Sequence, residues 1–594
     1  MNEETIIENV PARGGVDLAW LASCGLITAL AAFMRFFWLG LKPLHHDEGV
    51  NGFFLTTLFR EGTYKYDPAN YHGPTLYYIS LAFTKLFGLE TLPIRWSVAV
   101  FGVLTVVLAF FLWRYIGKIG ALFAALFLAL SPGMVFISRY FIHEIVFVFL
   151  SLAFVVAVLY FLDRETAGPF AVFWLALILL ICFLPSTLSL AAVIGGTNTT
   201  LVWAMRAVFF ALELLLVVLV IRMLLSWERG RPIYFLLASA CVALLFATKE
   251  TAFITLGTMA IACVCVWIWR KIRGTSTLAD GLSGDHLTWT GFRTATGRGT
   301  DQVLLYIAAA SLFIYLIVVF FSSFFSYPEG VKGFVEAYAI WTKTGSKDHT
   351  QNGFWAYFKW GMAVEAPLFV LSAVGAAVAF IKARHRFAMF AALWAFGLLL
   401  AYSIIPYKTP WLALSFLLPM CIVGGYAVNE IARGGTAAFR ALALAVGFAA
   451  AAVLAYQSYD LNFVRYDDEK MPYVYAHTRR EFDEMMRQTV RYADLSGKGK
   501  DAVIQIVSPD YWPMVWYLKD YPHANFHAQI VDPANAEIII AKRHDQDDEV
   551  IRRYSANYRY VGTYPLRPGV DLMLLVRKDL AGPDAKELYR INED

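Results

Sequence analysis

Long apolar runs separated by polar turns recur along the first 456 residues of this 594-residue chain. A helix needs about 20 consecutive apolar residues to cross a bilayer core, and a soluble protein does not contain so many runs of that length. We therefore predict a polytopic α-helical membrane protein with about 13 transmembrane helices. The predicted spans are 18–40, 92–113, 118–137, 144–162, 169–188, 201–225, 233–248, 251–270, 302–325, 356–381, 387–405, 410–431 and 438–456.

The composition agrees with this class of protein. Hydrophobic residues make up 59% of the chain and charged residues only 16%, whereas soluble globular proteins carry about 25% charged residues. All six cysteines lie within apolar runs, where isolated cysteines behave as small apolar residues, so we expect no disulfide framework. The net charge of +4 gives no reason to expect a nucleic-acid partner.

The lysines and arginines orient the chain, because cytoplasmic turns are enriched in these residues. Residues 1–17 are polar and precede a run too long for a signal peptide, so we expect them to stay in the cytoplasm. Every second turn after this segment is basic. This pattern predicts that the long first outer loop 41–91 and the segment 460–594 lie on the extracytoplasmic side of the membrane. The predicted cytoplasmic cations are Arg114, Lys118, Arg164, Arg229, Arg231, Arg270, Lys271, Arg273, Lys382, Arg384, Arg386, Arg433 and Arg440.

Residues 74–88 lie within this first outer loop and form a short apolar segment. The segment opens with Pro74, contains Lys85 and is short for a span. We predict an interfacial helix on the outer face of the membrane.

The segment 460–594 has the pattern of a soluble domain. Strand-like runs alternate with helical ones, which favours a small extracytoplasmic α/β domain after the transmembrane domain of residues 18–459. A helix is expected after Asp510 as its cap. Its aromatic residues Tyr511, Trp512 and Trp516 are expected in the domain core, with contact to the acceptor as the alternative. The predicted strands are 501–509, 536–542, 558–566 and 571–578.

Four titratable residues follow the first predicted span. The stretch "LHHDEGVNGFF" (44–54) places His45, His46, Asp47 and Glu48 at the outer membrane boundary. A solvated polar loop is one interpretation. A carboxylate that acts as a general base toward a hydroxyl is the other.

Further charged turns lie on the same predicted side. Ionisable groups at membrane depth are expensive and mark functional sites, so several such turns together predict a shared cavity. Cations there suit a departing phosphate, although Lys249 and Lys408 could instead extend to lipid head groups. The candidate substrate-binding residues are His72, Arg139, His143, Glu144, Lys249 and Lys408.

The order of these motifs resembles the GT-C membrane glycosyltransferases, which include the protein O-mannosyltransferases and the aminoarabinose–lipid A transferases. Within them, "LHHDEGVNGFF", "YHGPTLYY", "SRYFIHE", "ATKET", "IPYKTPW" and "SPDYWPMVWYL" are most similar to the flippase-activity-associated group. The resemblance spans nearly the whole chain. It implies a GT-C-like fold and a polyprenyl-phosphate sugar donor that resides among the membrane lipids. It also implies an acceptor that is a protein, a glycan or a lipid. It also places Asp47 and Glu48 at the catalytic positions, with Asp47 activating the acceptor in an inverting transfer.

One position departs from the related transferases. His72 stands where the aminoarabinose transferases have a glutamate implicated in metal binding, which puts an identical metal site in doubt. His45, His46 and His72 leave a divalent metal open as an alternative, since imidazole suits zinc or manganese. No cofactor is otherwise indicated.

Two functions of different classes fit these features. The main hypothesis is a membrane glycosyltransferase that moves a sugar from a polyprenyl-phosphate donor to an acceptor on the extracytoplasmic face. The alternative is a lipid-linked sugar flippase or transporter component without transferase activity. The sequence shows no internal repeat and no paired helix breaks in matching halves, which argues against a transporter.

Overall fold

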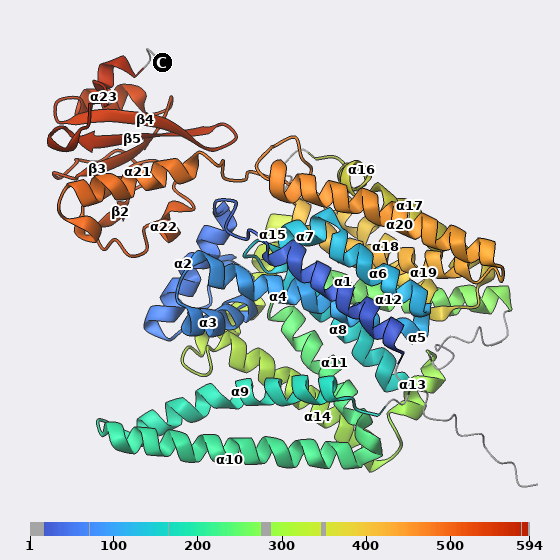
Figure 1. Cartoon of the computed structure of the whole chain (residues 1–594). Coiled ribbons are helices and arrows are strands. Elements are labelled where there is room, and N and C mark those ends of the chain that lie inside the picture. Colours follow the sequence, from blue (N-terminus) through green and yellow to red (C-terminus); the bar gives the residue numbers. More distant parts are fainter. Residues whose placement is uncertain are drawn as a thin grey trace, which may run out of the picture.

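The computed structural model describes residues 17–70, 72–163, 166–274, 287–345, 352–583 and 585–591. Residues 1–16 and Arg164, for which cytoplasmic positions were predicted above, lie outside the described residues. A helical bundle forms most of the molecule, and a smaller domain that contains a β-sheet lies at one end of it (Figure 1).

The bundle and the helices around it extend from α1 to α20. In chain order these are α1 Leu18–Phe36, α2 His46–Glu61, α3 Thr75–Phe87, α4 Thr91–Phe110, α5 Trp113–Ile116, α6 Lys118–Leu130, α7 Pro132–Ser138, α8 Glu144–Leu162, α9 Pro169–Gly195, α10 Thr199–Ser226, α11 Arg231–Phe246, α12 Ala252–Arg273, α13 Trp289–Ala295, α14 Thr300–Phe321, α15 Glu329–Gly345, α16 Ala356–Val364, α17 Ala366–Lys382, α18 Arg386–Ile404, α19 Leu414–Ala432 and α20 Ala437–Tyr459.

Ten helices among the described residues are long and apolar enough to cross a membrane, or twelve if each of two bent pairs counts as one span. The chain is therefore an integral membrane protein, but this count is below the thirteen spans predicted. Part of the difference lies in the stretch Thr199–Phe246, which contains both α10 and α11. Glu228 and Arg229 between them have left-handed φ angles of 42° and 58°, so the chain turns there.

The two bent pairs meet at one carboxylate. Helices α6 and α7 are bent by 57°, and α16 and α17 by 109°. Ser131 caps α7 through Met134 N, and Pro132 occupies the first turn, where its missing N–H leaves no bond unmade. Glu365 lies at the second break, and its Oε1 accepts hydrogen bonds from the Ser131 hydroxyl at 2.7 Å and from Gly133 N at 2.8 Å.

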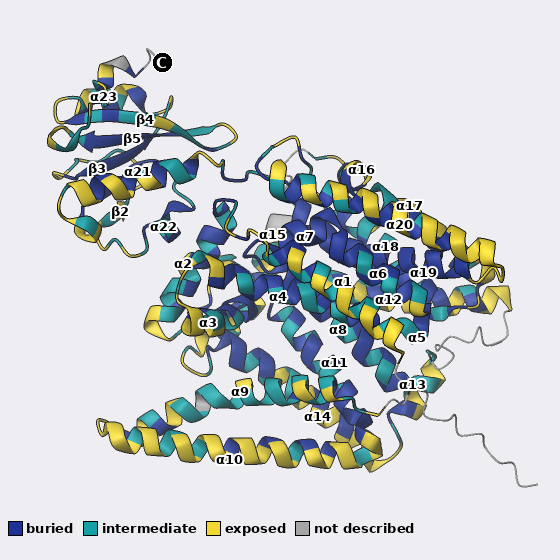
Figure 2. Cartoon of the chain, in the orientation of Figure 1, coloured by how far each residue is buried: buried dark blue, intermediate teal, exposed yellow. Residues whose placement is uncertain are grey.

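The bundle has a buried centre and an apolar exterior of the kind that faces lipid. Helix α19 is buried along its whole span, whereas the span of α1 is 17% buried. Figure 2 shows α10 mostly exposed along the lower edge of the molecule, beside α9. Its exposed side chains are mainly leucine, valine and phenylalanine, as expected for a helix that faces lipid.

The basic turns lie at the end of the bundle away from α2. Lys118 binds Asp17 at the start of α1, and Lys382 binds Glu430 near the end of α19, each at 2.5 Å. Arg270 donates to the carbonyl of Arg384 at 3.0 Å. These basic turns therefore lie together at one end of the bundle, as the cation pattern predicts. The side of the membrane that each end faces remains a prediction.

The C-terminal domain contains a five-stranded mixed sheet of order β2-β1-β3-β5-β4. Strand β1 pairs in parallel with β2 and β3, and β5 pairs antiparallel with β3 and β4. The four predicted strands are present; β2 was missed because it has three residues and little apolar character. The elements are α21 Phe482–Leu495, α22 Met514–Tyr517, α23 Asp547–Tyr554, β1 Ile504–Ile506, β2 Ala524–Phe526, β3 Ile538–Lys542, β4 Tyr558–Arg567 and β5 Val570–Arg577.

The turn around α22 docks the C-terminal domain onto α2 (Figure 1). The predicted helix after Asp510 is only this single turn, and Asp510 does not cap it. Trp516 is buried between the domains, where its Nε1 donates to Thr91 Oγ1 at 3.0 Å. The Tyr517 hydroxyl accepts a hydrogen bond from Leu44 N at 3.0 Å. These contacts fix the domain directly against the segment that carries Asp47.

Candidate active site

The "HHDE" segment is the first turn of helix α2, not a flexible loop. His45 is the N-cap, and its Nδ1 accepts from Asp47 N at 3.0 Å. Glu48 Oε2 accepts from His45 N at 3.0 Å, which completes a reciprocal capping box. Burial lowers the pKa of His45 to about 4, so this imidazole is neutral. This capping box fixes the start of α2 and thereby the direction in which the Asp47 side chain leaves the helix.

Two glycines of α2 have a packing role. A Cβ atom on Gly49 would lie 2.7 Å from Pro513, and one on Gly52 would lie 2.5 Å from the Trp516 ring. Both glycines therefore allow the C-terminal domain to approach the helix closely.

Glu48 is fully buried and bound on both oxygens. Arg95 donates from Nε to Oε1 at 2.8 Å and from Nη2 to Oε2 at 2.7 Å, and Phe141 N donates to Oε1 at 2.9 Å. Burial opposes ionisation, but Arg95 outweighs it and the pKa of Glu48 is lowered. Glu48 does not line the cavity described next. This geometry indicates that Glu48 holds the surrounding segments together, and it does not support the catalytic role expected for Glu48.

A polar cavity of about 530 Å³ lies between the N-terminus of α2, the start of α8, the turn after α11 and the C-terminal segment. It unites most of the charged turns that the sequence analysis singled out. Its ionisable lining residues are His45, His46, Asp47, His72, His143, Glu144, Lys249, Glu250 and Arg567, and its aromatic ones include Trp341, Tyr402, Tyr407, Trp411 and Tyr475.

Asp47 is the most exposed carboxylate of this cavity, and its Oδ2 lies 3.8 Å from Nδ1 of the neutral His45. Its side chain is 37% exposed, and among the described residues no lysine or arginine lies within ion-pair distance of it. Burial raises the pKa of Asp47 above the ordinary value of an aspartate, more than His46, His72 and Lys249 lower it. A carboxylate with these properties suits a general base.

The other two carboxylates of the cavity are paired. Glu144 forms a buried contact with the Lys249 ammonium, and Glu250 accepts from His72 Nδ1 at 2.9 Å. Burial opposes protonation of Lys249, but Glu144 and Glu250 outweigh it and raise the pKa of this lysine. The cavity therefore keeps a charged lysine facing its interior.

Gly73 explains why the "YHGP" and "ATKET" turns meet. Gly73 N donates to Thr248 O at 3.1 Å, and Thr75 Oγ1 donates to Ala247 O at 2.7 Å. A side chain on Gly73 would collide with the Ala247 carbonyl. The two backbones therefore pack directly, which brings His72 beside Glu250.

His143 lines the cavity in a neutral form. Its ring packs against that of His72 at an angle of 48°, with centroids 4.9 Å apart, and its Nε2 lies 3.1 Å from the Gly73 carbonyl. Burial lowers the pKa of His143 far below its ordinary value. Its second nitrogen, Nδ1, is buried and has no hydrogen-bond partner among the described residues.

Two predicted phosphate ligands lie outside the lining of the cavity. Arg139 donates to the carbonyls of Phe37 at 2.6 Å and Trp38 at 2.8 Å, so it terminates the first span. Lys408 Nζ donates to the Ile405 carbonyl at 2.6 Å and is buried. The geometry does not support the expected contact of either residue with a lipid phosphate.

The three histidines expected to hold a metal do not converge. His45 uses both ring nitrogens, for Asp47 N and the Tyr475 carbonyl, while His46 faces Arg567 and His72 faces Glu250. Among the described residues, no group of three or more His, Cys, Asp or Glu side chains is arranged to hold a metal ion. The side chains present do not fit the proposed metal site.

Arg567 is a cavity residue that the sequence analysis missed. It ends strand β4, more than 500 positions from Asp47, and its Nη1 lies 3.4 Å from His46 Nδ1. Nothing in the local sequence around Arg567 distinguishes it from a surface arginine. Only the docking of the C-terminal domain brings it to the site.

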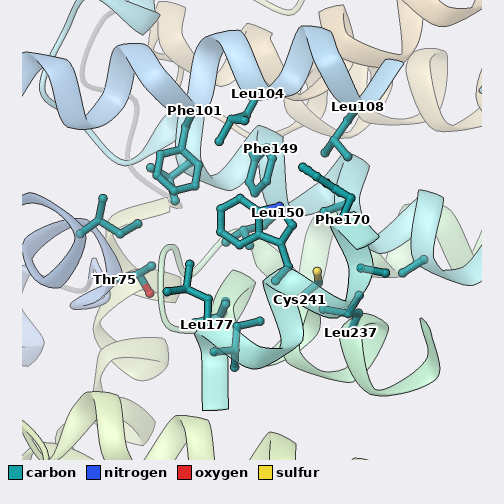
Figure 3. Close-up of a pocket in the computed structure, with 18 of the residues that line it drawn as sticks. Thr75, Phe101, Leu104, Leu108, Phe149, Leu150, Phe170, Leu177, Leu237 and Cys241 are labelled. Atoms are coloured by element: carbon teal, nitrogen blue, oxygen red, sulfur yellow. The ribbon is translucent and has the colours of Figure 1, made fainter. Parts of the chain in front are cut away.

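An apolar groove of about 450 Å³ adjoins the polar cavity. Figure 3 shows its lining: Phe101, Leu104 and Leu108 of α4, Phe149 and Leu150 of α8, Phe170 and Leu177 of α9, and Leu237 and Cys241 of α11, with Thr75 at one side.

The same segments of the chain line both the cavity and the groove. His72 lines the cavity and Thr75 the groove, and the same holds for Glu144 and Val146 of α8. Leu244 of α11 lines the groove, five positions before Lys249 in the cavity. Thr75 and Leu244 of the groove thus lie on the same segments of the chain as His72 and Lys249 of the cavity.

Sequence comparisons relate part of the chain to a known family. Residues 69–194 match the family described as "Dolichyl-phosphate-mannose-protein mannosyltransferase". This segment contains His72, His143 and Glu144 but neither Asp47 nor Lys249. A comparison with curated proteins finds no match.

Structure comparisons cover nearly the whole chain. ArnT from Cupriavidus metallidurans in the apo state is similar with a TM-score of 0.53 and 14% identity, over 95% of this chain and 100% of that chain. ArnT bound to undecaprenyl phosphate gives 0.47 and 14%, over 96% and 100%. The archaeal oligosaccharyltransferase AglB from Archaeoglobus fulgidus, in complex with an inhibitory peptide and a dolichol-phosphate, gives 0.44 and 12%, over 96% and 77%.

The likeness to apo ArnT extends from the membrane helices through the C-terminal domain. It confirms the resemblance stated from the sequence motifs at the level of the fold, while none of these comparisons bears on the flippase-activity-associated group. The chain is thus a polytopic membrane protein with the GT-C fold of the membrane glycosyltransferases.

Proposed function

We propose that this protein is a membrane glycosyltransferase that moves a sugar from a polyprenyl-phosphate donor to a hydroxyl acceptor at the polar cavity. The observation that carries the proposal is the position of Asp47, a carboxylate with no lysine or arginine partner among the described residues, in a polar cavity whose lining segments also line an apolar groove. The family that residues 69–194 match is named for a lipid-phosphate mannose donor, which agrees with this chemistry.

The groove supports a lipid-linked donor. Its lining is almost entirely hydrocarbon and belongs to membrane helices, so a polyprenyl chain can enter it from the bilayer. We place the phosphate of such a donor near His72 and the charged ammonium of Lys249. A phosphate there competes with Glu144 for Lys249, and the charge-assisted hydrogen bond stabilises the leaving group.

The transfer itself needs one base. The acceptor oxygen attacks the anomeric carbon of the sugar, and the bond between that carbon and the phosphate oxygen breaks as the new bond forms. Polyprenyl phosphate leaves with the electron pair, and Asp47 takes the acceptor proton. Because Glu144 and Glu250 are already paired, a second carboxylate nucleophile is not offered, and we propose inversion at the anomeric carbon.

We further propose that the cavity and the C-terminal domain face the extracytoplasmic side. The basic turns at the opposite end of the bundle support this orientation.

The test uses the purified full-length protein in nanodiscs with undecaprenyl-phosphate sugars labelled in the sugar. We expect release of undecaprenyl phosphate with labelled sugar appearing in water or on an added acceptor, and loss of this release in Asp47→Asn. Movement of intact donor between leaflets without cleavage would instead support the flippase alternative and overturn the proposal.

A further inference from the structure

The C-terminal domain supplies a cation to the polar cavity. Arg567 is the last residue of β4, and the β4–β5 hairpin positions it, since Arg567 pairs with Val570 across the turn. The adjacent Leu566 carbonyl accepts from Arg479 N at 2.9 Å. The backbone that carries the guanidinium is therefore held from two sides.

The side chain of Arg567 is also held. Its Nη2 donates to Asp510 Oδ1, and Lys542 binds the other oxygen of Asp510 at 3.1 Å. Arg567 remains 21% exposed, and it lines the cavity. An arginine has five N–H donors, and the contacts with Asp510 and His46 use one each. Donors therefore remain for a ligand in the cavity.

Arg567 and Lys249 reach the cavity from different parts of the fold. Lys249 follows the segment that lines the apolar groove, whereas Arg567 contacts His46, the neighbour of Asp47 toward the C-terminal domain. The proposed donor arrives from the groove. That leaves the other cavity residues near Asp47 for the acceptor, and these include Arg567 and His46.

We infer that Arg567, with His46, forms a subsite for an anionic group of the acceptor, a phosphate or a carboxylate close to the hydroxyl that receives the sugar. The planar guanidinium binds two oxygens of such a group at once, which fixes the orientation of the hydroxyl toward Asp47. This inference rests on the proposed transferase function and adds the chemical class of the acceptor.

The position of Arg567 also has a bland explanation, namely that its bond to Asp510 only stabilises the C-terminal domain. Lys542 provides the control for this explanation, because it binds the same Asp510 but does not line the cavity. Loss of either cation removes one partner of Asp510 within the C-terminal domain, while only Arg567 lines the cavity.

The experiment compares matched acceptors with the purified full-length protein in nanodiscs and labelled undecaprenyl-phosphate sugar. Glycerol 3-phosphate is paired with glycerol, and phosphatidylglycerol with diacylglycerol, so the two pairs separate a soluble from a lipid source of the phosphate. We expect the anionic member of one pair to be preferred. Arg567→Gln should lower transfer to it by roughly 10–100-fold, Arg567→Lys should lower it less, and Lys542→Gln should leave it unchanged.

Donor cleavage with water as the acceptor separates the two hypotheses. If the residue serves the acceptor, Arg567→Gln should lower this water reaction less than it lowers transfer to the anionic acceptor. Absence of donor cleavage by the wild-type protein with water and with all four acceptors would reject the transferase function itself. The subsite is overturned if neither anionic acceptor exceeds its neutral partner, or if Arg567→Gln lowers transfer to both members of a pair by the same factor. A matching loss in Lys542→Gln would also reject it and favour a purely structural contact.

Discussion

Arg95 binds both carboxylate oxygens of Glu48 and donates its remaining hydrogen bonds to the backbone carbonyls of Leu39, Lys42 and Pro43. One ion pair thus fixes the end of the first span, the chain that follows it and the start of α2. Asp47 precedes Glu48 by one residue, so this pair determines where the proposed base points. Asp47 and Glu48 therefore have different surroundings, so neutralising one should have a different effect from neutralising the other.

Glu48→Gln should destabilise the protein. Removing one partner of a buried ion pair costs about 3–5 kcal/mol, because Arg95 keeps its charge without a counterion. Thermal unfolding in detergent should show a lower midpoint and a reduced folded yield. Glu61→Gln, at the exposed end of the same helix, is the control and should leave the midpoint unchanged. Wild-type stability of Glu48→Gln would contradict the assigned role.

Asp47→Asn should lower transfer by about 10²–10⁴-fold, the usual contribution of a general base, while stability and donor binding persist. Asp67→Asn, at an exposed position outside the cavity, serves as its control. Turnover near wild type in Asp47→Asn would reject this base.

The pH dependence of the wild-type enzyme should report the same residue. Only the ionised carboxylate accepts a proton, and burial raises the pKa of Asp47. Activity should therefore be full above this raised pKa and fall as the pH drops through it, at a higher pH than an ordinary aspartate allows. The acidic limb of kcat/KM against pH measures this value. A limb at the ordinary aspartate pKa would show that the protein does not perturb Asp47.

Lys249→Gln should weaken donor binding, but it also leaves Glu144 buried without its cation. The double variant Lys249→Gln/Glu144→Gln removes both charges and should recover most of the stability. We expect donor affinity to stay low in the double variant, because the phosphate contact is still missing. Recovered donor affinity would show that Lys249 serves only Glu144. Lys408→Gln, outside the cavity lining, should affect donor affinity less than either variant.

Gly52→Ala should displace the C-terminal domain. The new methyl group would lie 2.5 Å from the Trp516 ring, and such overpacking costs about 1–3 kcal/mol, more than alanine contributes to helix propensity. Limited proteolysis should cut between the membrane domain and the C-terminal domain more rapidly. Gly257→Ala lies in helix α12 with open space around the added atom and should not increase cleavage. Equal cleavage of both variants would contradict this interface.

The membrane orientation has a direct test. A reporter fused after residue 460 should be active only in its extracytoplasmic form, because the basic turns lie at the opposite end of the bundle. A fusion after Arg384, within a basic turn, should give the opposite result. Cytoplasmic activity of the first fusion would reverse the predicted topology.

Much of this protein follows from its sequence alone. The apolar runs determine an integral membrane bundle, because a bilayer requires spans of a set length whatever their neighbours are. The alternating strand pattern determines the sheet of the C-terminal domain, except for the three residues of β2. The charged outer turns also predict that a polar cavity exists, since ionisable groups at this depth must face one another or water.

The tertiary structure alone decided what each charged residue does. Asp47 and Glu48 are adjacent in sequence, but one faces the cavity and the other faces Arg95, because successive helical residues point in different directions. Arg139 and Lys249 occupy similar outer turns, yet only Lys249 reaches the cavity, since backbone carbonyls bind the guanidinium of Arg139. Arg567 enters from a domain folded separately along the chain, and no local pattern records a contact across more than 500 residues.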